Sequence, residues 1–237
     1  MPNPSGNYET FSNWLNRQKT LLQQLLHAIS PENPYNTAQQ HSNLIDLVLS
    51  HYTLYYQEKG IAAREDPFLF LNPPWLTSFE RTLLWLGDFK PSIIFRLVNS
   101  SVTDLTAEQS ERIEQLKAVT RREERQLTER MAGIQESLAS APIYSLARRS
   151  HRLIDGEISW MEEAVEALKA AMLAILENAD VLRRSTAANV VEILSPIQAI
   201  RFLAAGVNFQ LEIRRWGQQR DWERASTSNG NGVLFWF

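Results

Sequence analysis

The chain contains no cysteine among its 237 residues. That absence excludes disulfides, zinc sites built on thiolates and cysteine nucleophiles. Glycine and proline are also sparse, at nine and ten residues, so the segments between them are long enough for extended helices. The formal net charge is -3. There is thus no basic excess to favour non-specific binding to nucleic-acid phosphates.

Long hydrophobic runs are absent as well. No uncharged apolar run approaches the ~18 residues of a membrane helix, so we expect no membrane span. The first twenty residues lack a positive start followed by an apolar segment, so we expect no signal peptide. The location that we expect is intracellular, in the nucleus and/or the cytoplasm. The hydrophobic content of 44% and charged content of 22% are typical of a globular protein.

The sequence also lacks the common catalytic motifs. It has no phosphate-binding GxxxxGK[ST] loop, no GxSxG nucleophile elbow, no HExxH zinc motif and no GxGxxG after a strand. Its four histidines are His27, His41, His51 and His151. His41 and His51 would stand about 80° apart and almost three turns away on one helix, which is a poor metal pair. We therefore expect no enzymatic activity, no metal and no cofactor.

Apolar residues recur every three or four positions along most of the chain, which is the period of one helix face. Thr106 and Gln109 form a capping box before a helix that reaches about Ser140. Ser195-Pro196 separates the last two helices, because serine caps a helix and proline suits its first position. With no strand alternation and no internal repeat, the pattern predicts an all-α single domain of long antiparallel helices in a bundle-like array. Three stripes lie in the first part of the chain: Phe11, Trp14, Gln18, Leu22, Leu25 and Ile29; Leu44, Leu47, His51, Leu54 and Tyr55; and Ile113, Leu116, Leu127, Met131, Ile134 and Leu138. A discontinuity at Gly156 precedes a fourth stripe, formed by Met161, Val165, Leu168, Met172, Ile175, Ala179 and Leu182. A helix at 186–194 follows, and the last stripe is Ile197, Ile200, Leu203, Val207 and Leu211, which fades near Trp222.

The stretch 75–92, WLTSFERTLLWLGDFKPS, predicts a sharp corner between two helices. One face of a helix from Trp75 to Leu86 would also carry Phe79 and Leu83. Gly87-Asp88 would end that helix, because glycine tolerates the left-handed conformation of a helix end. Pro91 would then begin a second helix, running to about Val98.

Several features allow two interpretations. The polar middle of the long helix that reaches about Ser140, residues 120–125, faces either solvent or a polar partner. The paired arginines at 121–122, 148–149, 183–184 and 214–215 indicate either a solvated helix face or a docking face for an acidic or phosphorylated partner. Five tryptophans lie on or near apolar stripes and are expected in the core: Trp14, Trp75, Trp85, Trp160 and Trp216.

The last residues differ in composition from the rest. The stretch 226–232, STSNGNG, is typical of a flexible linker. It leads to an apolar end, in which Phe235, Trp236 and Phe237 either dock on the domain or anchor a partner. The predicted organisation is therefore a helical domain at 1–224 and a flexible tail with an aromatic end at 225–237.

A series of short motifs resembles one plant regulatory domain. His51-Tyr52, Tyr55-Tyr56 and Lys59 precede the corner, and the corner itself resembles a FER…LWLGG(F/K)KPS motif. Further matches follow in order through the chain. They are Leu105-Thr106 with Gln109, Met131-Ala132 with Gln135, Leu138 and Ala139, Ala179-Asp180 with Leu182-Arg183 and Thr186, Gln198-Ala199 with Phe202-Leu203 and Ala205, and Arg214 with Trp216-Gly217 and Arg220-Asp221. The chain resembles the DELAY OF GERMINATION seed-dormancy family, which is related to the C-terminal domain of TGA-type bZIP factors.

The resemblance implies a non-enzymatic regulator that acts by protein–protein interaction in dormancy, development or abscisic-acid and stress signalling, in a transcription-related role. Implied partners are type 2C protein phosphatases, TGA-type factors or calmodulin. Direct DNA binding is not expected, since the chain shows no basic region or zipper. Haem, associated with late-domain histidines in the dormancy branch, is not expected either, because none follows His151. The alternative is a sensor for a small ligand, haem or lipid-like, between the helices. The resemblance and the corner together give the site residues to test: Trp75, Phe79, Arg81, Trp85, Pro91, Asp180, Arg183 and Trp216.

Overall fold

A computed structural model describes residues 4–30, 37–138 and 155–230. Over these residues the protein is all-α, as predicted, and it forms a single domain. Its elements are α1 (Pro4–Ala28), α2 (Ala38–Glu65), the 3-10 helix η1 (Pro67–Leu71), α3 (Ser78–Thr82), α4 (Ile93–Ser101), α5 (Ala107–Leu138), α7 (Asp155–Ile193) and α8 (Pro196–Gly230).

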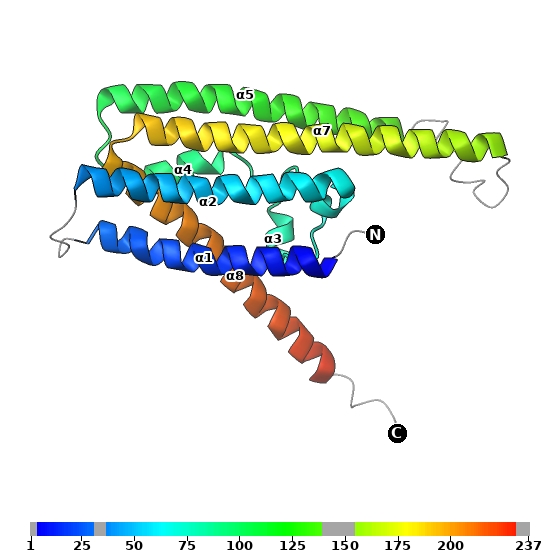
Figure 1. The fold of residues 1–237 in the computed structure, drawn as a ribbon, viewed down its shortest axis with the longest axis horizontal. Coiled ribbons are helices and arrows are strands. Elements are labelled where there is room, and N and C mark those ends of the chain that lie inside the picture. The colour runs from blue at the N-terminus through cyan, green and yellow to red at the C-terminus, as the bar shows by residue number, and fades with distance from the viewer. Residues whose placement is uncertain (1–3, 31–36, 139–154, 231–237) are drawn as a thin grey trace.

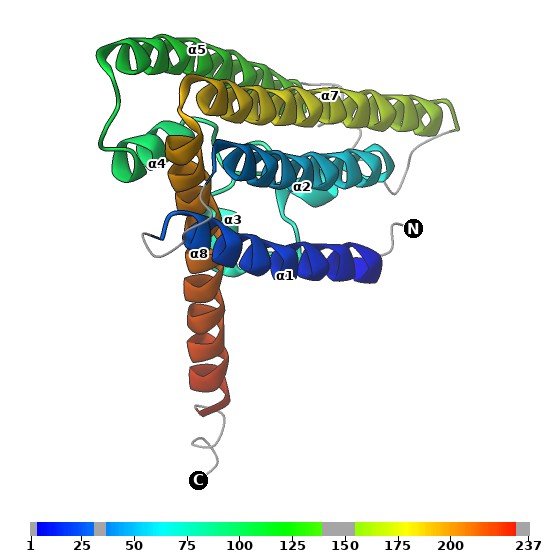
Figure 2. The same cartoon turned by 60° about the vertical axis from the view of Figure 1, so that its left-hand side comes forward.

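The long helices lie side by side in a layered, antiparallel array (Figure 1). α5 and α7 form one outer pair, α2 lies against α7, and α1 lies beyond α2. α8 crosses this array at an angle, contacting α1, α2, α3 and α4, and its last turns extend past α1 (Figures 1 and 2). The main core lies where α1, α2 and α4 meet the start of α8, around Leu25, Val48, Val98 and Ile200.

Polar caps set several helix ends where the sequence predicts them. Thr106 and Gln109 form the predicted capping box, with Thr106 N–H donating to Gln109 Oε1 over 3.0 Å and Gln109 N–H donating to Thr106 Oγ1 over 3.1 Å. α7 ends at Ile193 and α8 begins at Pro196, which confirms the break at Ser195-Pro196. Gln198 reaches back to accept from the backbone N–H of Ser195 over 2.9 Å.

The helix predicted from Trp75 to Leu86 is wrong: α3 covers only Ser78–Thr82. Thr77 caps it, because its hydroxyl accepts from the backbone N–H of Glu80. Leu86 has a φ of 48°, which no right-handed helix allows, so the chain leaves the helix before it. The next helix begins at Ile93 rather than at Pro91.

Two other boundaries differ from the prediction. α7 runs unbroken through 182–186, since no glycine or proline interrupts it after Gly156. α8 continues to Gly230, so the predicted linker is helical over 226–230. The domain boundary at 224 stays a prediction, and Phe235, Trp236 and Phe237 lie outside the described residues.

Some of the predicted apolar stripes do not face the core. Leu47 and Leu54 of α2 are half exposed, while Ile45, Val48 and Lys59 of the same helix are buried. Among the five tryptophans, Trp14 and Trp75 are buried, Trp85 is half-buried, and Trp160 and Trp216 are exposed. The physical reason is that periodicity marks a face, whereas the neighbouring helices decide which part of that face is covered.

The polar middle of α5, residues 120–125, contacts α7 and the corner on one side, and this contact decides between its two interpretations. Thr120 is buried and shares a hydrogen bond of 3.3 Å with Thr186 of α7. Glu124 is buried as well, and it accepts from the backbone N–H of Ser92 over 2.6 Å. The inward-facing residues of this stretch therefore meet a polar partner inside the molecule, while Arg121, Arg122 and Arg125 remain exposed.

Candidate functional site

Within the corner 75–92, residues 85–89 form a tight turn that closes on itself. Trp85 N–H donates to the Asp88 carbonyl over 2.7 Å, and Asp88 N–H returns to the Trp85 carbonyl over 3.4 Å. Leu86 and Gly87 between them have φ values of 48° and 80°. Gly87 suits this conformation, and a Cβ there would also lie 2.7 Å from a methyl of Leu176. Leu86 has no such freedom, and a left-handed bulky residue persists only where surrounding contacts hold it.

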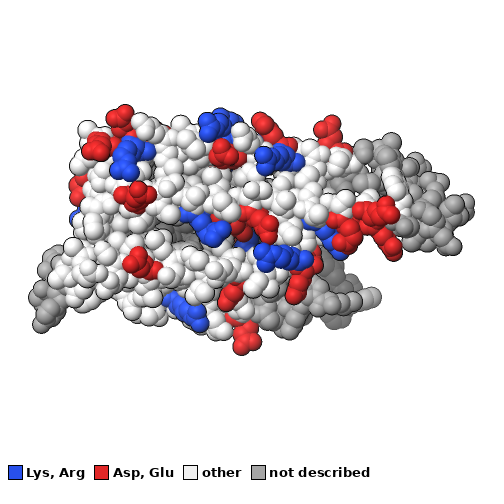
Figure 3. All heavy atoms as spheres, turned by 45° about the horizontal axis from the view of Figure 1, so that its top comes forward, with Lys and Arg blue, Asp and Glu red and all other residues white. Residues whose placement is uncertain are grey.

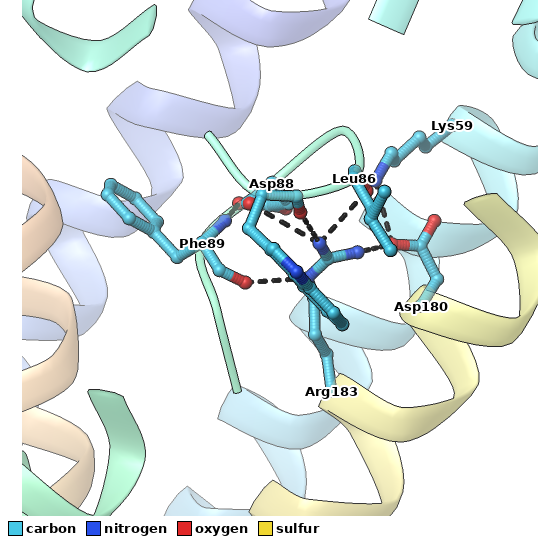
Figure 4. Close-up of polar contacts among 7 residues, drawn as sticks. Lys59, Leu86, Asp88, Phe89, Asp180 and Arg183 are labelled. Carbon is cyan, nitrogen blue, oxygen red and sulfur yellow. Dashed lines mark hydrogen bonds and ion pairs between the residues drawn. The ribbon is translucent and has the colours of Figure 1, made fainter. Parts of the chain in front are cut away.

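Arg183 of α7 provides those contacts (Figure 4). Its guanidinium donates to the carbonyls of Phe89 over 2.7 Å, of Leu86 over 2.9 Å and of Asp88 over 3.3 Å, and also to that of Trp85. Almost every backbone acceptor of the turn thus points at one buried side chain. A planar fork of five N–H groups suits this task, which a lysine in its place could not perform.

Asp180 and Lys59 complete a buried charge cluster under the corner (Figure 4). One carboxylate oxygen of Asp180 lies 2.7 Å from Lys59 Nζ and 2.5 Å from Arg183 Nη1. All three side chains are at least nine-tenths buried. Burial lowers the pKa of Lys59 below its usual 10.5, although the Asp180 carboxylate opposes that shift. The cluster joins three motifs that are far apart in sequence: the motif of His51-Tyr52, Tyr55-Tyr56 and Lys59, the corner, and the motif of Ala179-Asp180 and Leu182-Arg183.

Trp85 marks where the corner reaches the surface. Its ring is half-buried, and its Nε1–H donates to Thr128 of α5 over 3.0 Å. The Arg183 guanidinium lies 5.4 Å from the ring centroid and Lys90 Nζ lies 5.8 Å from it. Beside it, Leu83 and Lys90 are exposed, while Pro91 is fully buried. The edge of the hydrogen-bonded turn therefore carries one apolar side chain, Leu83, and one lysine, Lys90, whose ammonium lies 3.7 Å from the buried Glu124 carboxylate.

A second polar cluster fixes α3 to α8. Arg214 Nη1 donates to the Trp75 carbonyl over 2.7 Å and to Glu80 Oε2 over 2.8 Å. Asp221 accepts from the backbone N–H of Ser78 over 3.0 Å, and hydrogen bonds from Ser78 lower its pKa. Gly217 between them touches the cap of α3, because a Cβ there would lie 2.0 Å from the Thr77 hydroxyl. The motif of Arg214, Trp216-Gly217 and Arg220-Asp221 thus holds α3 against α8.

An aromatic cluster joins α1 to α2 nearby. Trp14 and His51 stack with ring centroids 5.5 Å apart at 8°. Burial, with a smaller effect of Arg17, lowers the pKa of His51 from 6.5 to about 4. Tyr52 is half-buried and donates to Gln210 of α8 over 2.7 Å, and burial raises its pKa. These groups tie the helices together and keep the histidine neutral.

The predicted site residues fall into two groups. Trp85, Asp180 and Arg183 belong to the turn 85–89 or to the charge cluster beneath it, and Trp75 and Pro91 are buried in the same stretch 75–92. Phe79 is half-buried beneath Arg220, whose guanidinium lies 5.7 Å from its ring, and Arg81 reaches Asn72 at 3.5 Å. Trp216 is 55% exposed and points away from these clusters.

The sequence analysis did not identify Glu80, Glu124 or Arg214 as structural groups. The signal that could have identified them is a charged residue at a position where the apolar stripe of a helix would continue. In two of the arginine pairs the members differ. Arg183 and Arg214 form buried or half-buried hydrogen bonds, while Arg184 and Arg215 are exposed to solvent. Figure 3 shows basic and acidic side chains interspersed over most of the face it presents, with several acidic side chains gathered toward its right-hand end.

A cavity of about 350 Å³ lies directly behind the corner. Asp88, Phe89 and Arg183 form one side of it, and side chains of α2, α4, α7 and α8 form the rest, mostly apolar. Tyr52, Tyr56 and Gln210 bring polar atoms to the wall. Its volume falls within the range of small-molecule sites, about 300–1,000 Å³.

Over the described residues, no cluster of histidine, aspartate and glutamate side chains could hold a metal ion. No helix in the same parts of the chain is both long and apolar enough to cross a membrane.

Comparison with known proteins agrees with this arrangement of motifs. Residues 21–100 match the family described as seed dormancy control, DOG1. The chain is 42% identical over 235 residues to Protein RESPONSE TO ABA AND SALT 1 of Arabidopsis thaliana, covering 95% of this chain and 100% of that protein. It is 31% identical over 215 residues to Protein DOG1-like 4 of the same plant, covering 90% and 92%. The chain belongs to the DOG1 family.

The DOG1 family is related to plant transcription factors. Transcription factor TGA2.3 of Oryza sativa subsp. japonica is 29% identical over 208 residues, which is 86% of this chain and 61% of the factor. The names of these relatives refer to seed dormancy control and to a response to abscisic acid and salt, and they support a plant regulatory role for this DOG1 protein. The resemblance to seed-dormancy and TGA-type proteins that the sequence motifs indicated is thus confirmed.

Proposed function

We propose that this DOG1 protein is a non-enzymatic regulator that binds other proteins through the corner 83–90. The observation that carries the proposal is the use of three buried charges to hold one half-buried turn, whose edge reaches the surface at Leu83 and Lys90. Lys59, Asp180 and Arg183 together stabilise a turn in which Leu86 has a left-handed backbone. Strained, rigidly held turns are concentrated at functional sites, because fixing a surface in advance lowers the entropic cost of binding.

The names of the relatives support a role in dormancy, development or abscisic-acid and stress signalling. The partners we propose are type 2C protein phosphatases, TGA-type factors or calmodulin. The likeness to TGA2.3 supports a transcription-related role in the nucleus, the cytoplasm or both, exerted through a partner that binds DNA.

The test is a binding assay with purified protein and each class of partner. Leu83→Glu changes one exposed side chain at the edge of the turn, so folding should be retained while partner binding falls at least tenfold. Leu26→Glu makes the same chemical change at an exposed position of α1 and should leave binding unchanged. Equal binding by the two variants would reject the corner as the docking element.

The cavity behind the corner favours one second function, a sensor of a small ligand. Its wall is largely apolar, and no histidine is found among the described residues that line it, so a lipid-like molecule suits it better than haem. Gly206→Leu would extend a side chain from α8 into this space, where a Cβ meets only Leu97 at 3.9 Å. Native mass spectrometry should show a bound ligand in the unaltered protein and lose it in the variant; a clean apo mass for both rejects the sensor.

A further inference from the structure

The cavity behind the corner has a polar end and an apolar end. Apolar side chains of α4 and α8 form much of its wall, among them Ile94 and Phe202. Tyr56, Asp88 and Gln210 form the polar part. The same three residues also line a smaller cavity of about 50 Å³, whose other side is formed by aromatic side chains of α1. Because they stand between the two cavities, these polar residues lie together at one end of the larger one.

The amide of Gln210 is oriented by two hydrogen bonds. Its Oε1 accepts from the Tyr52 hydroxyl over 2.7 Å and from Gln18 Nε2 over 3.2 Å. Both donors meet the same oxygen, so the amide NH2 group is left as a donor at the cavity wall. A ligand oxygen at this end can therefore accept a hydrogen bond from Gln210.

Asp88 supplies an acceptor at the same end. One oxygen of its carboxylate accepts from the backbone N–H of Phe89 over 2.7 Å, which leaves the second oxygen for a ligand. Burial raises the pKa of Tyr55 and of Tyr56, and the negative charge of Asp88 raises it further, so the carboxylate lies close to both rings. An ionised carboxylate only accepts hydrogen bonds, so the ligand group that meets it must be a donor.

The charges around this polar end sum to zero. Lys59 and Arg183 bring two positive charges, and Asp180 and Asp88 bring two negative charges. All three nitrogens of Arg183 already donate, either to Asp180 or to carbonyls of the turn. A charged ligand group would stay uncompensated here, and a buried charge without a partner is costly. The polar end therefore favours a hydroxyl over a carboxylate or an ammonium.

Gly206 leaves room beside the apolar end. It lies inside α8, where glycine is less favourable than alanine. An alanine would fit, because its Cβ would meet only Leu97, at the ordinary contact distance of 3.9 Å. Packing between the helices thus does not account for the glycine, whereas close approach of a bound molecule to the backbone does.

We propose that the cavity binds an uncharged, apolar molecule with a hydroxyl group, such as a terpenoid alcohol, whose oxygen lies between Asp88, Tyr56 and Gln210. The hydroxyl donates to the Asp88 carboxylate and accepts from one of the other two side chains. The proposal rests on the sensor function given above and adds the class of ligand. A fatty acid would instead place its carboxylate at Lys90 and Arg184, which line the cavity but are exposed.

Three probes of related skeleton test the ligand class: farnesol carries a hydroxyl, farnesoic acid a carboxylate and farnesene neither. In isothermal titration calorimetry with the full chain, farnesol should bind at least tenfold more tightly than the other two. Tighter binding of the acid would overturn the inference and assign the head group to the exposed cations. Equal binding of farnesene would overturn it as well, because the polar end would then contribute nothing. If no probe binds, the ligand class is wrong, while the native mass spectra of the unaltered protein and of Gly206→Leu decide separately whether the cavity is a ligand site.

Two conservative variants test the polar end itself. Tyr56→Phe should weaken farnesol about fivefold, the value of one hydrogen bond, and leave farnesene unchanged. Tyr55→Phe is the matched control, because Tyr55 lines the smaller cavity and not this one. Asp88→Asn removes one negative charge, so the affinity for farnesoic acid should rise about tenfold relative to that for farnesol. Asp104→Asn, at an exposed aspartate, should leave that ratio unchanged. Equal effects of the two tyrosine variants, or an unchanged ratio in Asp88→Asn, would overturn the inference.

Discussion

Replacement of Asp180 by alanine should destabilise the protein more than any exposed charge change. The variant leaves Lys59 and Arg183 as two buried cations without the carboxylate that joins them. Removing one member of a buried ion pair costs about 3–5 kcal/mol, because an uncompensated charge stays out of water. For a domain of this size, each kcal/mol corresponds to about 2–4 °C in melting temperature, so the loss should reach roughly 6–20 °C.

The same variant makes a prediction about pH. Lys59 already has a lowered pKa when folded, so the unfolded chain binds more protons and stability rises with pH towards the ordinary value of 10.5. Without Asp180, which raises the pKa of Lys59, this rise should begin at a lower pH. The difference in stability between the variant and the unaltered protein should therefore be smaller at pH 10 than at pH 7.

Urea denaturation followed by circular dichroism at both pH values would measure this. Asp104→Ala is the control, because its ion pair with Arg201 is at the surface and should contribute only about 0–1 kcal/mol. The reasoning is refuted if Asp180→Ala is no more destabilising than Asp104→Ala, or if its deficit grows as the pH rises.

Three further predictions follow from burial and close contacts. Gly217→Ala should destabilise by about 1–3 kcal/mol, because its Cβ would clash with the α3 cap, whereas Gly133→Ala, with open space around it, should stabilise α5 by up to about 1 kcal/mol; thermal denaturation of both checks the difference. Trp75→Ala should cost about 3–5 kcal/mol and the half-buried Trp85→Ala clearly less, so an equal loss in urea denaturation contradicts the burial argument. His51 has a folded pKa of about 4, below the 6.5 of the unfolded chain, so the unfolded state gains the proton first and stability should fall as the pH drops from about 6.5 to about 4. His51→Phe should flatten that dependence in urea titrations at several pH values, and an unchanged slope would assign the acid sensitivity to other groups.

The sequence already indicated many residues of the candidate site, but not the contacts among them. The motif of Ala179-Asp180 and Leu182-Arg183 and the motif LWLGDFKPS stood out by resemblance, and the structure brings them into contact through Arg183 and four backbone carbonyls. Nothing in the local pattern around Lys59 indicates that its ammonium lies beneath a turn far along the chain. Long-range pairing of this kind depends on how α2 and α7 pack, which no short window of sequence contains.

The sequence by itself determined the helices and many of their ends. Thr106 with Gln109 and Ser195 with Pro196 act over one turn of backbone, so their effect is local and was predicted correctly. Sparse glycine and proline likewise fixed the all-α class. Only the tertiary structure decided which apolar faces are buried: Leu54 lies on a predicted stripe yet faces solvent, and Trp216 projects from α8. Periodicity is a property of one helix, whereas burial is a property of its neighbours, and the crossing of α8 over the other helices decides which residues form the core and which remain available to bind.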